Sequence, residues 1–468
     1  MELKPLFQDI ADAIREKDGT TDEIKAADFP ERIRAIQGGG VTVEKLKITT
    51  PPDKIRYNPG DAFDPTGMAV WAELSNGCGL YVNHSDLAFS PAGPLELGVD
   101  AVTVTFRWEG QSISTTQKIE VTSIRIYGVE WDWDNGNSTK GTRTDVSANF
   151  PEPSPAVNNG TGSSPFDDLM PWAGMVKETR AGGVEVKEPK YWFKWTKTGK
   201  KLKLQIADGP VEGFHVDPVN MDRGDGLGEL DFSYIGRYHC VEGWKSETNK
   251  AQKVSITRST ARTGIHGLGA NFWQMDFAQF WYIGMLFLVE FADWNNERIG
   301  RGCSAGALKE NNGITDAMQY HTGTTAANRD TFGFTQYRNI EGWWDNVYDW
   351  MDGCYYNSNG LNVIKNPNQF SDNANGVLVG KPTNGYPSDF IIPTREGFEW
   401  AVYPNAADGS NTTYVPDSWY FSDSNPCLAH GGSYGKNLNH GLFCIYYSST
   451  SNTSIAYGCR LQERPPKA

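Results

Sequence analysis

Apolar residues recur every three or four positions over residues 2–17, and this spacing predicts a helix with one apolar stripe. A second short helix is expected to begin at Pro30, because proline is favoured at the first helical position, and to end at the glycines of residues 38–40. Two short helices bury little surface on their own. We therefore expect residues 1–40 either to oligomerise or dock through the stripe, or to fold as a hairpin without a partner. The stripe consists of Leu3, Leu6, Phe7, Ile10, Ala13 and Ile14.

Residues 41–122 show the two-residue alternation that is typical of β-strands. Val102, Val104 and Phe106 alternate with polar residues, and turn sequences that contain glycine recur between the predicted strands. This part of the chain is therefore predicted to be all-β.

Residues 123–468 combine short aromatic-rich strands with long loops that are rich in Gly and Asn. All of the 16 Trp residues except Trp71 and Trp108 lie in this part. One helix is expected over residues 277–296, and because apolar residues cover most of its circumference it should be buried. Its longest apolar run is interrupted by Glu290 and is too short to cross a bilayer.

The composition narrows the choice of partners. The formal net charge is −14 and no basic run occurs, whereas nucleic acids and anionic membranes select for basic surfaces. We therefore expect no nucleic-acid partner and no membrane insertion. The first nine residues lack the apolar stretch of a secretory signal. The seven cysteines are an odd number without CxxC spacing, so we expect free thiols in a protein made in a reducing cytoplasm.

The most informative segment is residues 431–461. Between Asn437 and Tyr457 no residue is charged, and Gln, Met and Trp are absent although the chain is rich in Trp. This residue set is typical of AAC and AAT codons whose adenines have been randomised, because such codons cannot become stop, Lys, Glu, Gln, Met or Trp. On composition alone, an ordinary β-hairpin rich in Ser and Asn remains the alternative.

The order of the residues carries a family resemblance. The framing sequences Gly431-Gly432, Gly441-Leu442-Phe443 and Gly458-Cys459-Arg460-Leu461 resemble the variable region of proteins diversified by retroelements. That family includes the major tropism determinants of phage tails and some bacterial surface proteins. The resemblance implies a C-type lectin fold whose last strands and loops display mutable residues on a rigid scaffold. Leu442, Phe443, Ile445 and Leu461 are the expected core residues of this scaffold.

The other residues of the segment have the composition of a binding surface. Tyr supplies large and rigid contact area, while Ser, Gly and Asn supply adaptable hydrogen bonds. Full burial of these tyrosines is not expected, because their hydroxyl groups need partners and their neighbours are polar. The variable, ligand-binding positions are therefore expected at Ser433, Tyr434, Gly435, Asn437, Asn439, His440, Tyr446, Tyr447, Ser448, Asn452, Ser454, Ile455, Ala456 and Tyr457.

Two stretches nearer the N-terminus also resemble phage proteins. Residues 10–25 resemble the N-terminal attachment segment of tail and fibre proteins, and residues 57–77 resemble bacterial immunoglobulin-like domains, which act as stiff spacers by default. The expected fold class is therefore mixed. Short N-terminal helices (1–40) precede an all-β immunoglobulin-like sandwich (41–122) and an α+β C-type lectin domain of the formylglycine-generating-enzyme type (123–468), with the variable region at about 431–461.

Catalytic chemistry finds little support in the residues. The seven histidines show no HxxxH or HExxH pairing, and the acidic loop from Asp217 to Asp231 departs from the EF-hand pattern. Formylglycine-generating enzymes share the implied fold and hold copper on a C-terminal cysteine pair. Cys444 and Cys459 are superficially suitable, but they adjoin framework residues and are expected to pack as small apolar groups. We expect no catalytic residue, metal or cofactor.

These expectations combine into a non-enzymatic receptor-binding protein of a phage tail, located in the virion. The resemblances imply that the N-terminus binds tail or baseplate proteins, that the protein is a homotrimer, and that the variable surface binds a host cell-surface receptor, either protein or glycan. The alternatives are a bacterial surface adhesin on the same fold and a formylglycine-generating-enzyme-like oxidase.

Overall fold

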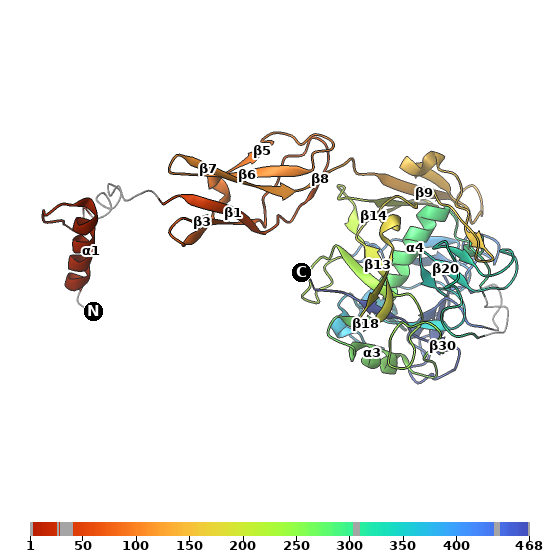
Figure 1. Ribbon diagram of the computed structural model, residues 1–468. Helices are drawn as coiled ribbons and strands as arrows, with labels where there is room; N and C mark the ends of the chain where they lie inside the picture. Colours follow the sequence, from red (N-terminus) through yellow and green to blue (C-terminus); the bar gives the residue numbers. More distant parts are fainter. Residues whose placement is uncertain (1–2, 26–27, 29–40, 303–308, 435–439, 467–468) are drawn as a thin grey trace. The chain divides into compact units, whose positions relative to one another are not determined.

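The computed structural model describes residues 3–25, 28, 41–302, 309–434 and 440–466. The chain is mostly β, with 34% of its residues in strands and 12% in helices. Three α-helices and several sheets lie in the described residues. By its internal contacts the chain divides into two compact units, Met1–Ser123 and Ile124–Ala468, and each is described by itself (Figure 1).

The first helix, α1 (Leu3–Asp18), follows the predicted stripe only in part. Ala11 and Ile14 are buried against Ile24 and form a small apolar cluster with it. Ala13, which the spacing assigns to the stripe, is exposed. The inward place is taken by Ala11, which lies three positions before Ile14 and therefore on the same face of the helix.

Two further N-terminal predictions concern the exposure of Phe7 and a second helix. Phe7 of α1 is 42% exposed, so this member of the stripe is accessible. The second helix, predicted to begin at Pro30, lies outside the described residues.

Two three-stranded antiparallel sheets, β1-β3-β4 and β5-β6-β7, follow in the first unit. The predicted alternation is confirmed in β6, where Val102, Val104 and Phe106 are buried and the residues between them are partly exposed. Val104 and Phe106 share one core with Leu46 of β1 and Val70 of β3, so the sheets pack face to face. The elements are β1 (Val43–Thr50), β2 (Arg56–Tyr57), β3 (Ala69–Leu74), β4 (Gly79–Val82), η2 (His84–Asp86), β5 (Leu87–Ser90), β6 (Ala101–Trp108), β7 (Gln111–Lys118) and β8 (Glu120–Val121).

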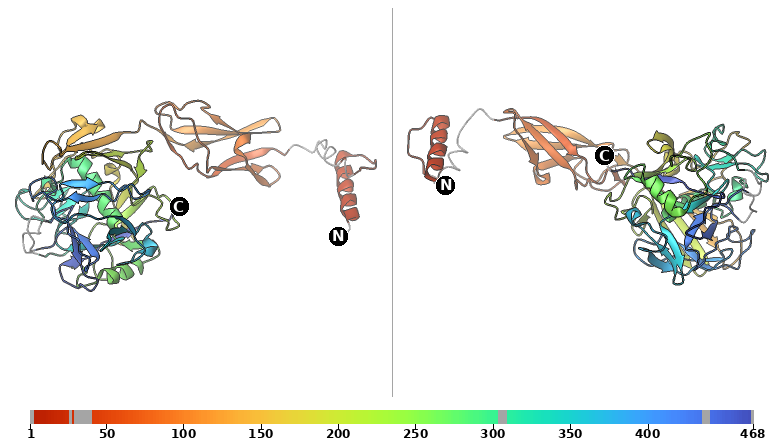
Figure 2. Two further views of the ribbon diagram at one scale, coloured as in Figure 1. Left: turned by 180° about the vertical axis from the view of Figure 1, so that it is seen from behind. Right: turned by 90° about the horizontal axis from the view of Figure 1, so that it is seen from below.

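Helix α4 (Phe277–Phe291) runs through the middle of the second unit, and all of its residues are buried (Figures 1 and 2). This burial confirms the interpretation of its all-round apolar pattern. Asp276 caps the N-terminus by accepting a hydrogen bond from the backbone N–H of Gln279. The predicted end at residue 296 is wrong. The helix ends earlier because Ala292 takes a left-handed backbone conformation, with a φ of 51°.

Six sheets of the described residues lie around this helix, and two of them have five strands, in the orders β10-β9-β15-β14-β16 and β12-β13-β17-β31-β18. The others are β11-β19-β20-β21, β29-β28-β22-β30, β23-β24-β25 and β26-β27. The strands are β9 (Ile126–Asp132), β10 (Thr142–Asp145), β11 (Ala156–Val157), β12 (Lys177–Arg180), β13 (Gly183–Pro189), β14 (Trp192–Thr198), β15 (Lys201–Ala207), β16 (His215–Val216), β17 (Phe232–Gly236), β18 (Phe272–Gln274), β19 (Gly323–Thr324), β20 (Thr335–Tyr337), β21 (Ile340–Glu341), β22 (Tyr348–Met351), β23 (Cys354–Asn357), β24 (Gly360–Val363), β25 (Val377–Gly380), β26 (Asp389–Ile391), β27 (Tyr403–Ala406), β28 (Cys427–His430), β29 (Ile445–Ser448), β30 (Tyr457–Gly458) and β31 (Leu461–Glu463). Short 3-10 turns complete the unit: η3 (Val146–Asn149), η4 (Trp172–Gly174), η5 (Asn296–Arg298) and η6 (Pro367–Gln369).

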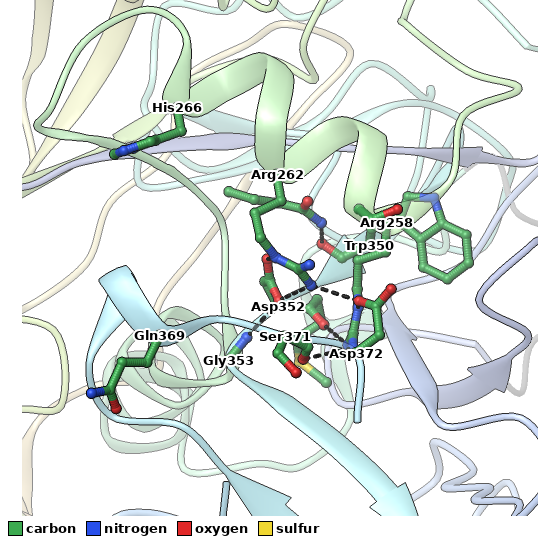
Figure 3. A network of polar contacts seen from close by, with 12 residues as sticks. Arg258, Arg262, His266, Trp350, Asp352, Gly353, Gln369, Ser371 and Asp372 are labelled. Atoms are coloured by element: carbon green, nitrogen blue, oxygen red, sulfur yellow. Dashed lines mark hydrogen bonds and ion pairs between the residues drawn. The ribbon is translucent and has the colours of Figure 1, made fainter. Parts of the chain in front are cut away.

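A network of ion pairs fixes helix α3 (Arg258–His266) to the residue pair just before β23 and to the segment that follows η6. Arg262 donates to both carboxylate oxygens of Asp352 over 2.6 and 2.8 Å, and it also reaches Asp372. Arg258, which is fully buried, donates to Asp372 over 2.9 Å and to the main-chain oxygen of Cys354 over 2.7 Å. Figure 3 shows both guanidinium groups reaching from α3 toward the two carboxylates. Because each charge has an opposite charge beside it, the burial of this network is tolerated.

The C-terminal segment contributes strands to two sheets. Strand β31 pairs with β17 on one side and with β18 on the other, both antiparallel. Strand β30 pairs in parallel with β22. Strand β31 is therefore held between two strands from far earlier in the sequence.

Candidate functional site

The residues expected to be variable lie mainly on one four-stranded sheet and its connections. Its order is β29-β28-β22-β30, so β29 and β30 are its two outer strands. Residues 449–456 connect these outer strands. An outer strand and a connecting loop both leave side chains accessible, which suits a binding surface.

The predicted framework residues form a buried base for this surface. Leu442, Phe443, Ile445 and Leu461 are all fully buried, which confirms that prediction. The Phe443 ring packs against Trp294, with ring centroids 4.7 Å apart. Leu442, Phe443 and Ile445 are therefore part of the main apolar core that contains α4, whereas Leu461 belongs to a second buried cluster.

The accessible described positions of the segment include two tyrosines, several small polar residues and the apolar Ile455. Tyr446 and Tyr447 are half-buried and stack on each other, with centroids 4.9 Å apart and planes at 14°. Ser454 is exposed, and Ile455 is 58% exposed. Asn452 is half-buried and donates to the hydroxyl of Ser448 over 2.7 Å, which fixes the start of the loop. Half-buried Ala456 completes this connection.

Three predicted binding residues are buried, and their assignment to the accessible surface is wrong. Ser433 is fully buried, Ser448 is 7% exposed and Tyr457 is 9% exposed. The Tyr457 ring packs on Tyr348 and Trp350 of β22, with centroids 5.0 and 4.7 Å away. This burial raises the pKa of Tyr457 to about 12. The prediction failed because it relied on the polar neighbours of Tyr457 in the sequence. The residues that bury its ring come from a strand about a hundred residues earlier.

The remaining predicted positions lie before Gly441. Tyr434 is half-buried, and its backbone N–H donates to the main-chain oxygen of Asn346 over 3.0 Å. His440 is half-buried and lies beside Tyr446, with ring centroids 6.3 Å apart. Gly435, Asn437 and Asn439 lie outside the described residues.

Sequence reasoning missed two aromatic residues that support the surface. Tyr348 is 2% exposed, and its ring contacts those of Tyr446, Tyr457 and His440 at centroid distances of 6.4, 5.0 and 5.9 Å. Tyr420 meets Tyr446 edge-on at 5.9 Å. These residues belong to other parts of the chain, and no local pattern distinguishes them from the many other core aromatics.

Sequence reasoning also missed Asp417, a buried acidic residue that binds the backbone at the base of the variable segment. It is 2% exposed, and its Oδ2 accepts a hydrogen bond from the backbone N–H of Phe443 over 2.8 Å. Burial raises the pKa of its carboxyl to about 8, which the bonds from Phe443 and Gly441 only partly oppose. A Cβ atom at Gly441 would lie 2.5 Å from Asp417 and 2.0 Å from the side-chain amide of Asn296, so only glycine fits there.

Arg460 anchors the other end of the segment. It is fully buried and donates to Asp349 of β22 over 3.1 Å. It also donates to the main-chain oxygens of Gly236, Arg237 and Glu341 over 2.9, 2.8 and 2.9 Å. The Arg in the framing sequence therefore ties the last strands to three distant segments.

The acidic loop and the cysteines were the other chemical candidates. Asp217 is buried and accepts backbone hydrogen bonds from Tyr191 and Asn220 over 3.1 and 2.8 Å, so it organises a turn. Cys444 and Cys459 are buried free thiols. Cys459 contacts the thiol of Cys240 instead, and burial raises the pKa values of Cys444 and Cys459 well above the ordinary range. Within the part of the chain that the structure describes, no three His, Cys, Asp or Glu side chains are arranged to hold a metal ion.

No family model matches the chain, and no curated protein has a significantly similar sequence. Among the described residues, no helix has the length and apolar character needed to cross a membrane.

Proposed function

We propose that the protein is a non-enzymatic receptor-binding protein of a phage tail, whose C-terminal surface is diversified by a retroelement. The observation that carries the proposal is the separation of residues 441–461 into two sets. Leu442, Phe443 and Ile445 are fully buried, whereas Tyr446 and Tyr447 beside them are accessible. Such a separation lets the accessible residues change while the fold is kept, because surface substitutions cost little stability.

The proposal includes a role for each part of the chain. The helical segment at residues 1–40 attaches to tail or baseplate proteins and assembles three copies. The two packed sheets of residues 41–122 are an immunoglobulin-like spacer, and residues 123–468 are a C-type lectin domain. Three copies on one tail would let weak contacts at single sites give useful avidity. The protein then belongs to the virion.

The binding surface supports a host receptor, protein or glycan, as the ligand. Apart from Ile455 and two threonines, its accessible residues are mainly Tyr, Ser, Asn and His, which include the types that paratopes use for rigid contact area and adaptable hydrogen bonds. Tyr446 and Tyr447 form a stacked pair whose ring planes are nearly parallel, which makes a rigid aromatic unit on this surface.

Sequencing the gene across one phage population tests the proposal. Sibling genes should differ almost only at residues 433–440 and 446–457, with a near-copy of the 3′ end and a reverse transcriptase gene nearby. At Tyr457, which is 9% exposed, the accepted replacements should be those that fill the space against Tyr348 and Trp350. Changes spread evenly over residues 124–468 would contradict retroelement diversification.

A further inference from the structure

Two buried cysteines from distant parts of the chain lie against each other near the end of the variable segment. Cys459 stands between β30 and β31, and Cys240 follows β17. Both side chains are fully buried in one apolar cluster, which also contains Tyr457. The two thiol groups are close enough to share a hydrogen bond. The pair therefore connects the end of the variable segment to a part of the fold that comes much earlier in the sequence.

The backbone holds the two residues at the spacing that a disulfide needs. The N–H of Cys240 donates to the main-chain oxygen of Cys459 over 2.7 Å. Residues that are hydrogen-bonded in this way across a β-ladder have Cα atoms about 5.5 Å apart. Disulfides span Cα separations of about 4.4–6.8 Å. The two sulfur atoms can therefore join by rotation of the side chains, without displacement of the backbone.

Both cysteines belong to segments that the fold already holds together. Arg460, which follows Cys459, donates to the main-chain oxygens of Gly236 and Arg237 over 2.9 and 2.8 Å. These two residues lie a few positions before Cys240. Two groups held in contact by rigid segments react with each other far faster than with a partner free in solution, because their encounter costs no further entropy.

Other cysteines of the described residues have different surroundings. The thiol of Cys444 is hydrogen-bonded to the side chain of Ser418. The thiol of Cys354 lies 4.0 Å from the main-chain oxygen of Met351. Cys78 is exposed and belongs to the first unit. The geometry therefore favours a bond between Cys240 and Cys459.

We infer that Cys240 and Cys459 form a disulfide when the protein leaves a reducing cytoplasm and meets a small disulfide such as oxidised glutathione. The thiolate of one cysteine attacks a sulfur of the small disulfide, which releases one small thiol and leaves a mixed disulfide. The thiolate of the other cysteine then attacks the protein sulfur of the mixed disulfide, and the second small thiol leaves. The two cysteines together lose two electrons and two protons, and the small disulfide gains both as it becomes two thiols.

Burial determines when this exchange takes place. It raises the pKa of the Cys459 thiol well above the ordinary range, and in the closed fold neither sulfur is accessible to a solute. The exchange therefore takes place during folding or during local opening of the last strands. The finished bond is shielded from reductants in the same way. The inference concerns the oxidised chain and does not depend on the proposed function.

Oxidation of the full chain tests the inference. The protein is purified under a reductant and incubated with oxidised glutathione, at a urea concentration just below its unfolding transition, where local opening is frequent. After removal of both reagents and alkylation of free thiols, peptide mapping by mass spectrometry should find Cys240 joined to Cys459. The bond closes a loop of roughly 220 residues and constrains the unfolded chain, so the melting temperature should rise by about 5 °C or more. Dithiothreitol at the same urea concentration should reverse the rise.

Three results would overturn the inference. The first is that both cysteines are found alkylated after the oxidation. The second is that either of them is joined to a different cysteine. The third is that the bond forms and lowers the melting temperature, because the native backbone would then not accommodate it.

Two variants identify the bond as the cause of the added stability. Cys240→Ala removes one partner, so oxidation should no longer raise the melting temperature. The matched control is Cys427→Ala, which removes another buried thiol of the same apolar cluster and should keep the full rise. A rise of equal size in the Cys240 variant would show that another bond is responsible. The peptide map of the parent protein decides the question even if a variant is too unstable to purify.

Discussion

Neighbouring residues of the C-terminal segment have opposite roles, and substitution should separate them. Phe443 is fully buried against Trp294, so Phe443→Ala should cost about 3–5 kcal/mol of unfolding free energy. Tyr446→Ala and Tyr447→Ala should leave stability nearly unchanged and weaken host binding by about 1–3 kcal/mol, as hot-spot truncations do. Urea denaturation and binding to susceptible cells measure the two effects. Early unfolding of either tyrosine variant would show that its ring supports the core.

Tyr457 should behave like Phe443 and unlike the other tyrosines. Its ring packs between residues of β22 and is 9% exposed. Tyr457→Ala should therefore cost about 3 kcal/mol or more of stability through the cavity that it leaves. Tyr457→Phe keeps the ring and is the matched control, with an expected loss of about 1 kcal/mol for the hydroxyl group. Equal unfolding midpoints for the Ala variant and the parent protein would contradict this burial.

Asp417 gives the segment a defined pH dependence. Burial raises the pKa of its carboxyl from the ordinary 3.8 to about 8 in the folded chain. The unfolded chain therefore releases this proton first, and the favourable contribution present below pH 3.8 is lost as the pH rises to about 8. Asp417→Asn cannot titrate. Its melting temperature relative to the parent should therefore rise steadily between pH 4 and pH 8, as measured by thermal scans at matched pH values. A constant difference would show that Asp417 is already ionised at acidic pH.

Local sequence predicts burial well where the partners are generic. Leu442, Phe443 and Ile445 need only an apolar environment, and their burial followed from their place in the framing sequence. Tyr457 depends on one particular neighbour, β22, and Asp417 acts through backbone groups of another segment. Such pairings are set by tertiary structure, which a short polar run does not encode.

At the scale of elements, the attachment of α3 depends on charge. Arg262 is the cation that donates to both carboxylate oxygens of the fully buried Asp352. Arg262→Met would leave this carboxylate without its paired charge and should cost about 3–5 kcal/mol of stability. Adding Asp352→Asn to the same chain removes the buried charge and should recover part of that loss. Urea denaturation of the two single variants and the double variant measures the coupling. Strictly additive losses would show that the ion pair is not energetically coupled.

The sequence predicted a helix only where its apolar pattern was clear. Helix α4 is apolar on all sides and was recognised, although its end at Phe291 depends on the backbone of Ala292. Helix α3 was not predicted, because its sequence is polar and includes Gly264, a poor helix former. It is held by Arg258 and Arg262, whose acidic partners lie about a hundred residues away.

At the scale of the whole molecule, the change in composition near residue 122 marks a physical division. The contacts divide the chain between Ser123 and Ile124. A fragment covering Ile124–Ala468 should therefore fold alone. It should unfold at the temperature at which this same unit unfolds in the full chain. Calorimetry of both proteins measures this. A fragment that melts well below the full chain would show that the first unit stabilises the second.

The N-terminal helix should control assembly. Its cluster of Ala11, Ile14 and Ile24 is small, and Phe7 is 42% exposed, so the helix has apolar surface to share with other copies. Light scattering of the full chain at micromolar concentration should give the mass of a trimer. Phe7→Asp should shift that mass to the monomer, because a charge cannot be buried between helices without a partner. Gln8→Asp adds the same charge at the next position of α1, where the residue is also exposed, and it should keep the trimer if Phe7 lies in the interface.

Host binding should fall when the Phe7 variant loses the mass of the trimer, since three linked sites bind more strongly than one. A monomeric parent protein would remove both the interface and the avidity that the proposed tail function uses.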